Sequence, residues 1–409
     1  MPMPEKGRSA EEIVRDLKQR GQYDVDWRDG KTAVYVFNAG EDVGALKKEA
    51  YSAFMEENGL GPIAFPSLKR MEEDVIGMAL GLLHGPEGST GAMTSGGTDS
   101  ITMAIKTARD YARDQHSTPG RANIVLPYSA HLAFDKAAHL MDIEIRRVPV
   151  RRDTYLADIP AMESMCDENT IMVVGSAPNF PYGVIDPIED LSDMCAHHGL
   201  WLHVDACVGG YLAPFVRMNG GDIPPFDFEC AGVQSMSADL HKYGYCAKGA
   251  STVLFRSADL FKFMPFDMDC WSGARMVTPT LAGTRPGGAI SAAWSVMNYL
   301  GIEGYREKQA QVVAAREKIE SGLKALGFEI LGEPKLGLMA FQHPDHHAYA
   351  LWGKMAEKGW FTSLNADPPS LHLMLSPKHL EVADLYLKDL ADCMELVTSE
   401  TEKVEARYS

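Results

Sequence analysis

The stretch "MSADLHKYGYCAKGAS", residues 236–251, decides how the fold of this chain is interpreted. An adjacent His241 and Lys242 would by themselves be typical of a solvated turn. Here the pair lies between "GVQSMSA" (232–238) and "GASTVLFR" (249–256), two short apolar runs that predict strands. Lys242 is therefore expected at the end of a strand inside an α/β pattern, where open sheets bind their ligands.

The same alternation of strand and helix extends on the N-terminal side of this stretch. Further strands are predicted at 122–130, 144–150, 170–178 and 200–206, and helices at 100–115, 131–141 and 187–199. This rhythm predicts an α/β fold with a mainly parallel central sheet and helices on both faces.

Helices and a few strands flank this central part. A Ser-x-x-Glu capping box opens a helix at 9–24, and two more helices are predicted at 45–59, stopped by Gly59, and at 67–85. A long helix at 304–327 leads to strands within 329–342 and 371–377, which indicates a small C-terminal α+β domain. We predict an N-terminal helical segment (1–60), a large cofactor-binding domain (61–295) and a small C-terminal domain (296–409).

Composition narrows the possible functions. The chain has 409 residues and a formal net charge of −17, which argues against a surface for nucleic-acid phosphates. Its seven cysteines are dispersed without metal-ligand spacing, so we expect reduced thiols and no metal. The N-terminus lacks the apolar core of a secretory signal, and no run approaches the roughly 18 apolar residues of a membrane helix. A soluble, cytoplasmic protein is expected.

Two further segments carry possible chemistry. Ser95-Gly96-Gly97-Thr98 directly precedes the helix at 100–115, where glycines, free N–H groups and the helix dipole favour an anion. "LWLHVDACVGGY" (200–211) ends an apolar strand at Asp205, where a buried carboxylate needs a cation or several donors. Each has a plain structural alternative: a capped tight turn, and a satisfied structural aspartate.

Taken together, these segments are the parts needed to hold pyridoxal phosphate. The cradle would take the phosphate, and Asp205 would keep the ring nitrogen protonated. Lys242 would form the Schiff base. His131, in "PYSAHLAFDKAA", starts a helix after a strand and would lie over the ring.

Six motifs then resemble a known family. These are "TSGGTDS", "SAHLAFDKAA", "SAPNFPYGVIDPI", "HVDACVGGY", "SADLHKYGYCAKG" and "SGARMVTPTLAGTRPGG". In order and spacing they are similar to the sphingosine-1-phosphate lyases of the group II pyridoxal-phosphate-dependent decarboxylase superfamily. The resemblance implies an aminotransferase-like (fold type I) fold and pyridoxal 5'-phosphate as the cofactor.

The resemblance also implies roles for individual residues. Lys242, Asp205 and His131 would be catalytic, and the cofactor site would comprise Ser95, Gly96, Gly97, Thr98, His131, Asp205, His241, Lys242 and Thr284. The loop from Thr284 to Gly287 matches one that the family contributes across a dimer interface, so a homodimer with a shared active site is expected. Substrate contacts are expected from Lys248, Arg285, Phe37, Asn38, Gly61 and Tyr243.

The chain departs from the family at the substrate end. Phe37 and Asn38 stand where the lyases have a Tyr-His pair, and Gly61 stands where they have a His. Each lost charge-assisted hydrogen bond to a phosphate is worth roughly 1.5–3 kcal/mol. Sphingosine-1-phosphate itself is therefore expected to be a poor substrate.

Three functional hypotheses remain open from the sequence. The first is a carbon–carbon lyase that cleaves a β-hydroxy amine, with Tyr243, Tyr245 and Lys248 as candidates for the base. The second is an amino-acid α-decarboxylase on the same scaffold. The third is a non-catalytic binding protein, which the presence of Lys242, Asp205 and His131 disfavours.

Overall fold

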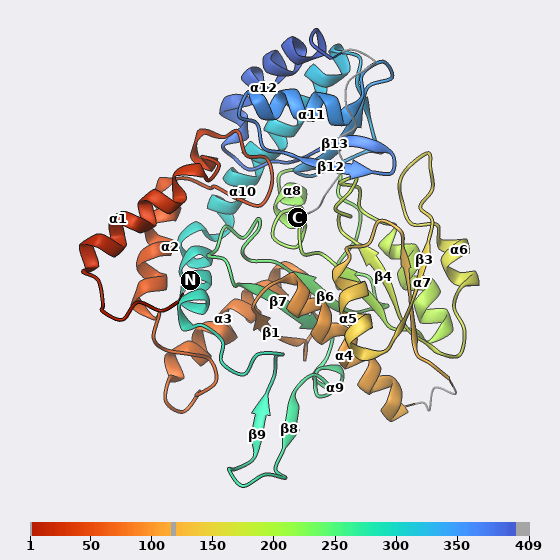
Figure 1. Cartoon of the computed structure of the whole chain (residues 1–409). Coiled ribbons are helices and arrows are strands. Elements are labelled where there is room, and N and C mark those ends of the chain that lie inside the picture. Colours follow the sequence, from red (N-terminus) through yellow and green to blue (C-terminus); the bar gives the residue numbers. More distant parts are fainter. Residues whose placement is uncertain (1, 116–119, 398–409) are drawn as a thin grey trace.

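A seven-stranded sheet forms the centre of the computed structural model, which describes residues 2–115 and 120–397 (Figure 1). The strands follow the order β1-β7-β6-β5-β4-β2-β3, and only β7 runs antiparallel to its neighbours. Their bounds are Thr90–Thr94 (β1), Asn123–Pro127 (β2), Glu144–Val148 (β3), Thr170–Ser176 (β4), Leu202–Asp205 (β5), Val233–Ala238 (β6) and Ser251–Phe255 (β7). The predicted, mainly parallel sheet is confirmed.

Helices cover both faces of this sheet because its buried strands alternate their apolar side chains between the faces. Ile124 of β2 packs with α4 (Gly97–Gln115) and α5 (Ala133–Met141) on one face. Val125 joins the core on the other face, formed with α3 (Pro66–Leu82), α7 (Ile188–His198) and α10 (Gly287–Ala325). Of the helices in the described ranges, none is both long and apolar enough to cross a membrane.

A second, antiparallel sheet builds the C-terminal part with its own core. Its order is β10-β11-β13-β12, and its bounds are Glu329–Ile330, Leu338–Gln342, Pro369–Met374 and Ser363–Ala366 respectively. The helices α11 (Ala348–Glu357) and α12 (His379–Met394) complete this α+β unit. Helix α10 leads into it and is interrupted at Gly301, whose φ of 53° and ψ of −170° are not helical. The predicted domain boundary at 295/296 falls inside α10, and the three-part division stays a prediction.

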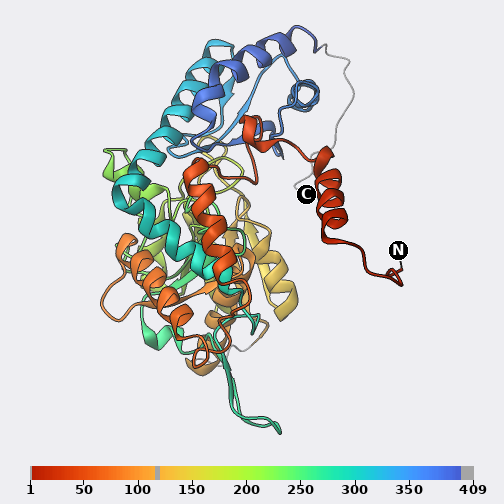
Figure 2. The same ribbon diagram turned by 90° about the vertical axis from the view of Figure 1, so that its left-hand side faces the viewer.

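The N-terminal segment contains two of the predicted helices. Helix α1 (Ala10–Arg20) has the expected capping box between Ser9 and Glu12, and it projects from the body of the molecule (Figure 2). Helix α2 is Glu41–Ala53, so the prediction of 45–59 was wrong at both ends. Helix α2 ends before Gly59 because the backbone of the following segment pairs with a distant loop. The N–H of Gly59 donates to the carbonyl of Arg285 (2.9 Å), and the carbonyl of Glu57 accepts from the N–H of Gly287 (2.9 Å).

Several elements of the structure were not predicted from the sequence. Strand β1 is defined by its pairing with β7, and β8 (Phe266–Met268) pairs with β9 (Met276–Thr278) in a hairpin that extends from the body (Figures 1 and 2). Short helices were also missed: α6 (Ile159–Ser164), α8 (Ala213–Met218) and α9 (Ala258–Phe261), with 3-10 turns at Gly21–Tyr23 and Trp27–Asp29. Strand β12 and helices α11 and α12 complete the missed elements.

Candidate active site

A cavity of about 350 Å³ lies at the carboxyl ends of the central parallel strands. Ser176 ends β4 and Asp205 ends β5, and the two are paired in register. Lys242 follows β6 by four residues, and the N-terminus of α4 adds the segment from Ser95 to Thr98. The cavity is therefore in the place where open α/β sheets bind ligands.

The amino group of Lys242 is held by a carboxylate that the sequence analysis overlooked. Lys242 Nζ lies 3.0 Å from Oδ2 of Asp239, a residue with 2% side-chain exposure. Burial alone would lower the pKa of Lys242, but the negative charge of Asp239 raises it well above its usual value. The local signal was the spacing Asp-x-x-Lys in "SADLHK", which puts both side chains on one turn after the strand.

Asp205 is buried and lines the same cavity. Its Oδ1 accepts hydrogen bonds from the backbone N–H of Cys207 (3.1 Å) and from Ser237 Oγ (3.2 Å). His131 lines the same cavity, and its Nδ1 accepts from the N–H of Ala133 (3.1 Å). Burial lowers the pKa of His131 even though Asp205 opposes the shift, so the imidazole is neutral at pH 7.

The glycine turn before α4 is closely packed against the Lys242 segment. A Cβ on Gly97 would come within 2.8 Å of Cys207 Sγ and 2.9 Å of Asp239 Oδ2. A Cβ on Gly96 would lie 3.3 Å from His241 Cε1. Glycine at position 97 is thus required by space, and it lets the N-terminus of α4 reach the cavity floor.

Polar atoms around the cavity fit a ligand with several hydrogen-bonding groups. Within the described ranges, four buried side-chain atoms of cavity residues have no partner: Asp99 Oδ1, Ser176 Oγ, Asp239 Oδ1 and His241 Nδ1. Buried polar atoms are normally paired, and each unpaired one costs about 1–3 kcal/mol. With an amine on one side and Asp205 on the other, this set of groups fits pyridoxal phosphate.

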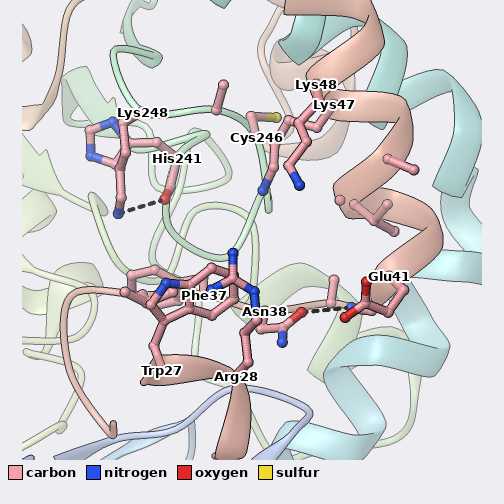
Figure 3. A pocket seen from close by; sticks show the side chains of 17 residues that line it. Trp27, Arg28, Phe37, Asn38, Glu41, Lys47, Lys48, His241, Cys246 and Lys248 are labelled. Atoms are coloured by element: carbon pink, nitrogen blue, oxygen red, sulfur yellow. Dashed lines mark hydrogen bonds between the residues drawn. The ribbon is translucent and has the colours of Figure 1, made fainter. Parts of the chain in front are cut away.

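A second cavity of about 380 Å³ adjoins the first through His241, which lines both (Figure 3). Lys47 and Lys48 reach it from α2, Lys248 from the loop after β6, and Arg28 from the opposite side (Figure 3). Its wall also includes Trp27, Phe37, Asn38, Glu41 and Cys246. We call this cavity the basic pocket.

Lys248 and Lys47 have unusual surroundings in the basic pocket. Lys248 Nζ donates to the carbonyls of Tyr35 (2.7 Å) and His241 (3.4 Å) and lies 5.3 Å from the centre of the Phe37 ring. Burial of the amino group lowers the pKa of Lys248 to about 8, although the side chain as a whole is exposed. Lys47 Nζ donates to the carbonyl of Tyr245 (3.2 Å), and burial lowers its pKa as well.

The chain matches the pyridoxal-dependent decarboxylase conserved domain over residues 1–343. It belongs to that family. It is 39% identical over 395 residues to the sphingosine-1-phosphate lyase of Oryza sativa subsp. japonica, covering 94% of this chain and 73% of that protein. It is also 34% identical over 346 residues to a probable L-tyrosine/L-aspartate decarboxylase of Methanothermobacter thermautotrophicus, covering 84% and 93%.

A solved structure of a sphingosine-1-phosphate lyase is also similar to this chain. The sphingosine-1-phosphate lyase of Burkholderia pseudomallei superposes with a TM-score of 0.93 at 33% identity, covering 97% of this chain and 92% of that one. The predicted family, the fold type I architecture and pyridoxal phosphate as the cofactor are confirmed. The protein is an enzyme of the lyase class, so the hypothesis of a non-catalytic binding protein is set aside.

The structure brings most of the expected residues into two groups. Lys242, Asp205, His131 and His241 line the first cavity together with Ser95, Gly96, Gly97 and Thr98. Lys248, Phe37 and Asn38 line the basic pocket. Gly61 lines neither cavity, and a side chain at this position would contact Ala64 and Phe65 instead. Thr284 is exposed and also lies outside both cavities.

Arg285 already has a carboxylate partner in this chain, and its expected role as a substrate cation stays a prediction. Its side chain is buried and forms an ion pair with Glu72, and its guanidinium donates to the carbonyls of Met93 (3.1 Å) and Gly59 (3.4 Å). The neighbouring carboxylate neutralises its charge. Arg285 therefore fastens its loop to α3 and β1 and lines neither the first cavity nor the basic pocket.

The two tyrosines considered as bases are both buried away from the cavities. Tyr243 donates to the carbonyl of Leu375 (2.6 Å), and Tyr245 donates to Gln309 Oε1 (2.9 Å). Burial raises the pKa of both phenols well above the usual value. Neither tyrosine lines the first cavity or the basic pocket, so the geometry gives no support to Tyr243 as a substrate contact or to either tyrosine as the base, and both roles stay predictions. Of the three candidates for the base, Lys248 is the one that lines the basic pocket.

Tyr243→Phe therefore tests a structural role. The variant leaves the Leu375 carbonyl without its donor, so we expect the free energy of unfolding in urea to fall by about 1–2 kcal/mol. We expect kcat to stay within a few-fold of the wild type. Tyr23→Phe is the matched control, since Tyr23 is 89% exposed and should change neither quantity. A hundredfold loss of kcat at unchanged stability would return Tyr243 to the reaction.

Proposed function

We propose that this enzyme is a carbon–carbon lyase acting on a β-hydroxy amine that carries a small anionic group, phosphate or carboxylate. The observation that supports this substrate class is the basic pocket beside Lys242. In the reaction the bond between the amine-bearing carbon and the hydroxyl-bearing carbon breaks. The hydroxyl group loses its proton and its carbon leaves as the carbonyl carbon of an aldehyde, while the amine-bearing carbon takes up a proton to give an amine.

The residues of the first cavity that were expected to hold the cofactor each have a part in this proposal. Lys242 carries the cofactor covalently, Asp205 holds a proton on the ring nitrogen, and the neutral imidazole of His131 covers the ring. The turn from Ser95 to Thr98 and His241 bind the cofactor phosphate. Bound pyridoxal phosphate supplies the electron sink for the pair left by the broken bond.

The cations of the basic pocket outnumber its carboxylates, since Glu41 is the one acidic residue among its described lining residues. Across the ranges the structure covers, Arg28, Lys47, Lys48 and Lys248 form no ion pair with a carboxylate. Lysines that lose hydration next to one another favour the neutral form, as the lowered pKa values of Lys47 and Lys248 indicate. An anion in the pocket would relieve this repulsion, which is why we assign the charged end of the substrate to it.

Lys47 supplies a positive charge in the part of the pocket where Phe37 and Asn38 depart from the family pattern. Phe37 and Asn38 lack the charges of the Tyr-His pair, but Lys47 adds an amino group to the same pocket. We therefore propose that an anionic group is still bound, by a different set of donors. Sphingosine-1-phosphate itself remains a poor substrate in this proposal, and a smaller phosphorylated or carboxylated amine is favoured.

An amino-acid α-decarboxylase is the second candidate. The similarity to a probable L-tyrosine/L-aspartate decarboxylase along 93% of its length favours it. In that case the basic pocket would receive a side-chain carboxylate, and CO2 would leave in place of the aldehyde. Product analysis with phosphorylated and unphosphorylated β-hydroxy amines, beside plain amino acids, separates the two candidates.

Borohydride reduction of the holoenzyme is expected to fix the cofactor to Lys242. Peptide mapping should find the label there, and Lys242→Ala should abolish turnover. Lys248→Ala is the matched control, because it removes the neighbouring amine and should leave the label in place. A label on Lys248 would refute the assignment of Lys242.

Lys47→Met and Lys248→Met should weaken the substrate anion contact. We expect kcat/KM for a phosphorylated β-hydroxy amine to fall about 10- to 100-fold in each, with little change for the unphosphorylated analogue. Because Lys248 is charged below its pKa of about 8 and neutral above it, KM for the phosphorylated substrate should rise as pH passes 8. The exposed Lys69→Met is the control. If kcat rather than KM changed through pH 8, Lys248 would be the base and not an anion contact.

We also propose that the enzyme acts as a cytoplasmic homodimer. The seven cysteines are free thiols, in keeping with a reducing compartment. Large apolar side chains on and beside the β8–β9 hairpin are exposed, namely Phe266, Met268, Trp271, Val277 and Leu281, and the loop with Thr284 follows them. An exposed apolar surface of this kind is typical of a protein interface.

Mixing two inactive variants tests the shared site. Lys242→Ala and the bulky Thr284→Tyr should each be inactive or nearly so as homodimers. If Thr284 serves the partner's site, a hybrid dimer keeps one intact site, and an equal mixture should recover about a quarter of wild-type activity. An active monomer in light scattering, or no recovery on mixing, would contradict the shared site.

A further inference from the structure

A row of buried side chains leads from the interior of the sheet to Asp205. Strands β5 and β6 pair so that His203 is opposite Ser235 and Asp205 is opposite Ser237. Trp201 Nε1 lies 2.8 Å from Ser235 Oγ, and His203 Nδ1 lies 2.8 Å from the same oxygen. His203 Nε2 lies 3.3 Å from Ser237 Oγ, which lies 3.2 Å from Asp205 Oδ1.

The carboxylate of Asp205 fixes the direction of the protons along this row. An ionised carboxylate can only accept, so Ser237 gives its single hydroxyl proton to Asp205. Ser237 Oγ can then only accept from His203, which places the ring proton of His203 on Nε2. His203 Nδ1 therefore accepts from the hydroxyl of Ser235, and the Trp201 indole donates to the same oxygen.

The surroundings keep this row in one charge state. His203 is fully buried, and burial lowers its pKa to about 4, so the ring is neutral at pH 7. The Phe134 ring packs edge-on against it at 5.8 Å, which holds the ring plane. The Cys207 thiol also contacts Ser237, and burial raises the pKa of this thiol well above its usual value, so it contributes no charge.

We propose that Trp201, Ser235, His203 and Ser237 form a positioning relay that fixes the His203 tautomer and keeps the negative charge on Asp205 directed at the ring nitrogen of bound cofactor. The proposal rests on the role of Asp205 proposed above. Two donors, Ser237 and the N–H of Cys207, then face one carboxylate oxygen, and hydrogen bonds of this kind favour the charged form. The second oxygen is left for the ligand.

The first test uses the enzyme without cofactor and ¹⁵N-labelled histidine. At pH 7 the NMR signals of His203, assigned by their loss in His203→Asn, should be those of the neutral Nε2–H tautomer. Ser237→Ala removes the acceptor of the Nε2–H proton, so a mixture of tautomers is expected. His372 is the internal control: it is equally buried, and its Nε2 lies 2.8 Å from the Phe180 carbonyl, so its signals should not change. An Nδ1–H tautomer in the wild type, or no response to Ser237→Ala, overturns the relay.

The second test uses holoenzyme loaded with pyridoxal phosphate that is ¹⁵N-labelled in the ring. Ser237→Ala should lower the apparent pKa of the ring nitrogen by about one pH unit, the size of one lost hydrogen bond to a charged group. Ser192→Ala is the matched control, since Ser192 is also buried. Its Oγ accepts a hydrogen bond from the N–H of Gly232 (2.8 Å), which lies outside the relay.

Asp205→Asn separates failure of the relay from failure of the proposed function. If Asp205→Asn leaves the ring-nitrogen signal unchanged, the role of Asp205 is wrong. If Asp205→Asn shifts the signal while Ser237→Ala behaves like Ser192→Ala, the role of Asp205 holds and the relay is overturned.

Discussion

The parallel pairing of β4, β5 and β6 is the constraint on which the rest of the site depends. Because the three strands end at the same edge, Ser176, Asp205 and Ser237 stand side by side in register. A shift by one residue in any of them would turn these side chains to the opposite face of the sheet. The apolar contacts of α4 on one face and α7 on the other hold that register, so packing of the core fixes the geometry of the polar site.

The lysines near the site differ in how their charge is compensated. Lys242 has a buried carboxylate, Asp239, at 3.0 Å, which keeps a single, defined position for its amino group. The hydrogen-bond partners of Lys47 and Lys248 among the described residues are backbone carbonyls alone. The first environment would suit a covalent anchor, and the second would suit an anion that binds and leaves in each turnover. Under the function proposed above, electrostatics divides the two adjoining cavities into a cofactor half and a substrate half.

All of the expected cofactor residues except Thr284 line the first cavity, and the sequence could point to them because their signals are local. An apolar strand followed at once by Asp205, or by the Lys242 turn, is visible within a dozen residues. The contacts that the sequence did not predict join distant segments. Arg285 is neutralised by Glu72, 213 positions away, and Tyr243 bonds to Leu375, 132 positions away. Strand β1 and the end of α2 depend in the same way on pairing with β7 and with the segment 285–287.

The substrate half could not be predicted for a further physical reason. Its walls come from the 3-10 turn at Trp27–Asp29, from α2 and from the loop after β6, so their proximity depends on how three distant segments pack. When single positions are compared with the lyases, Asn38 in place of a histidine suggests that a phosphate contact has been lost. In the folded chain, Lys47 lies one helical turn beyond Val43 on the buried side of α2 and brings a cation into the same space. If the proposed function holds, the cations of the pocket can differ in position from those of the lyases while the cofactor site keeps its residues, and one scaffold could then accept different anionic substrates.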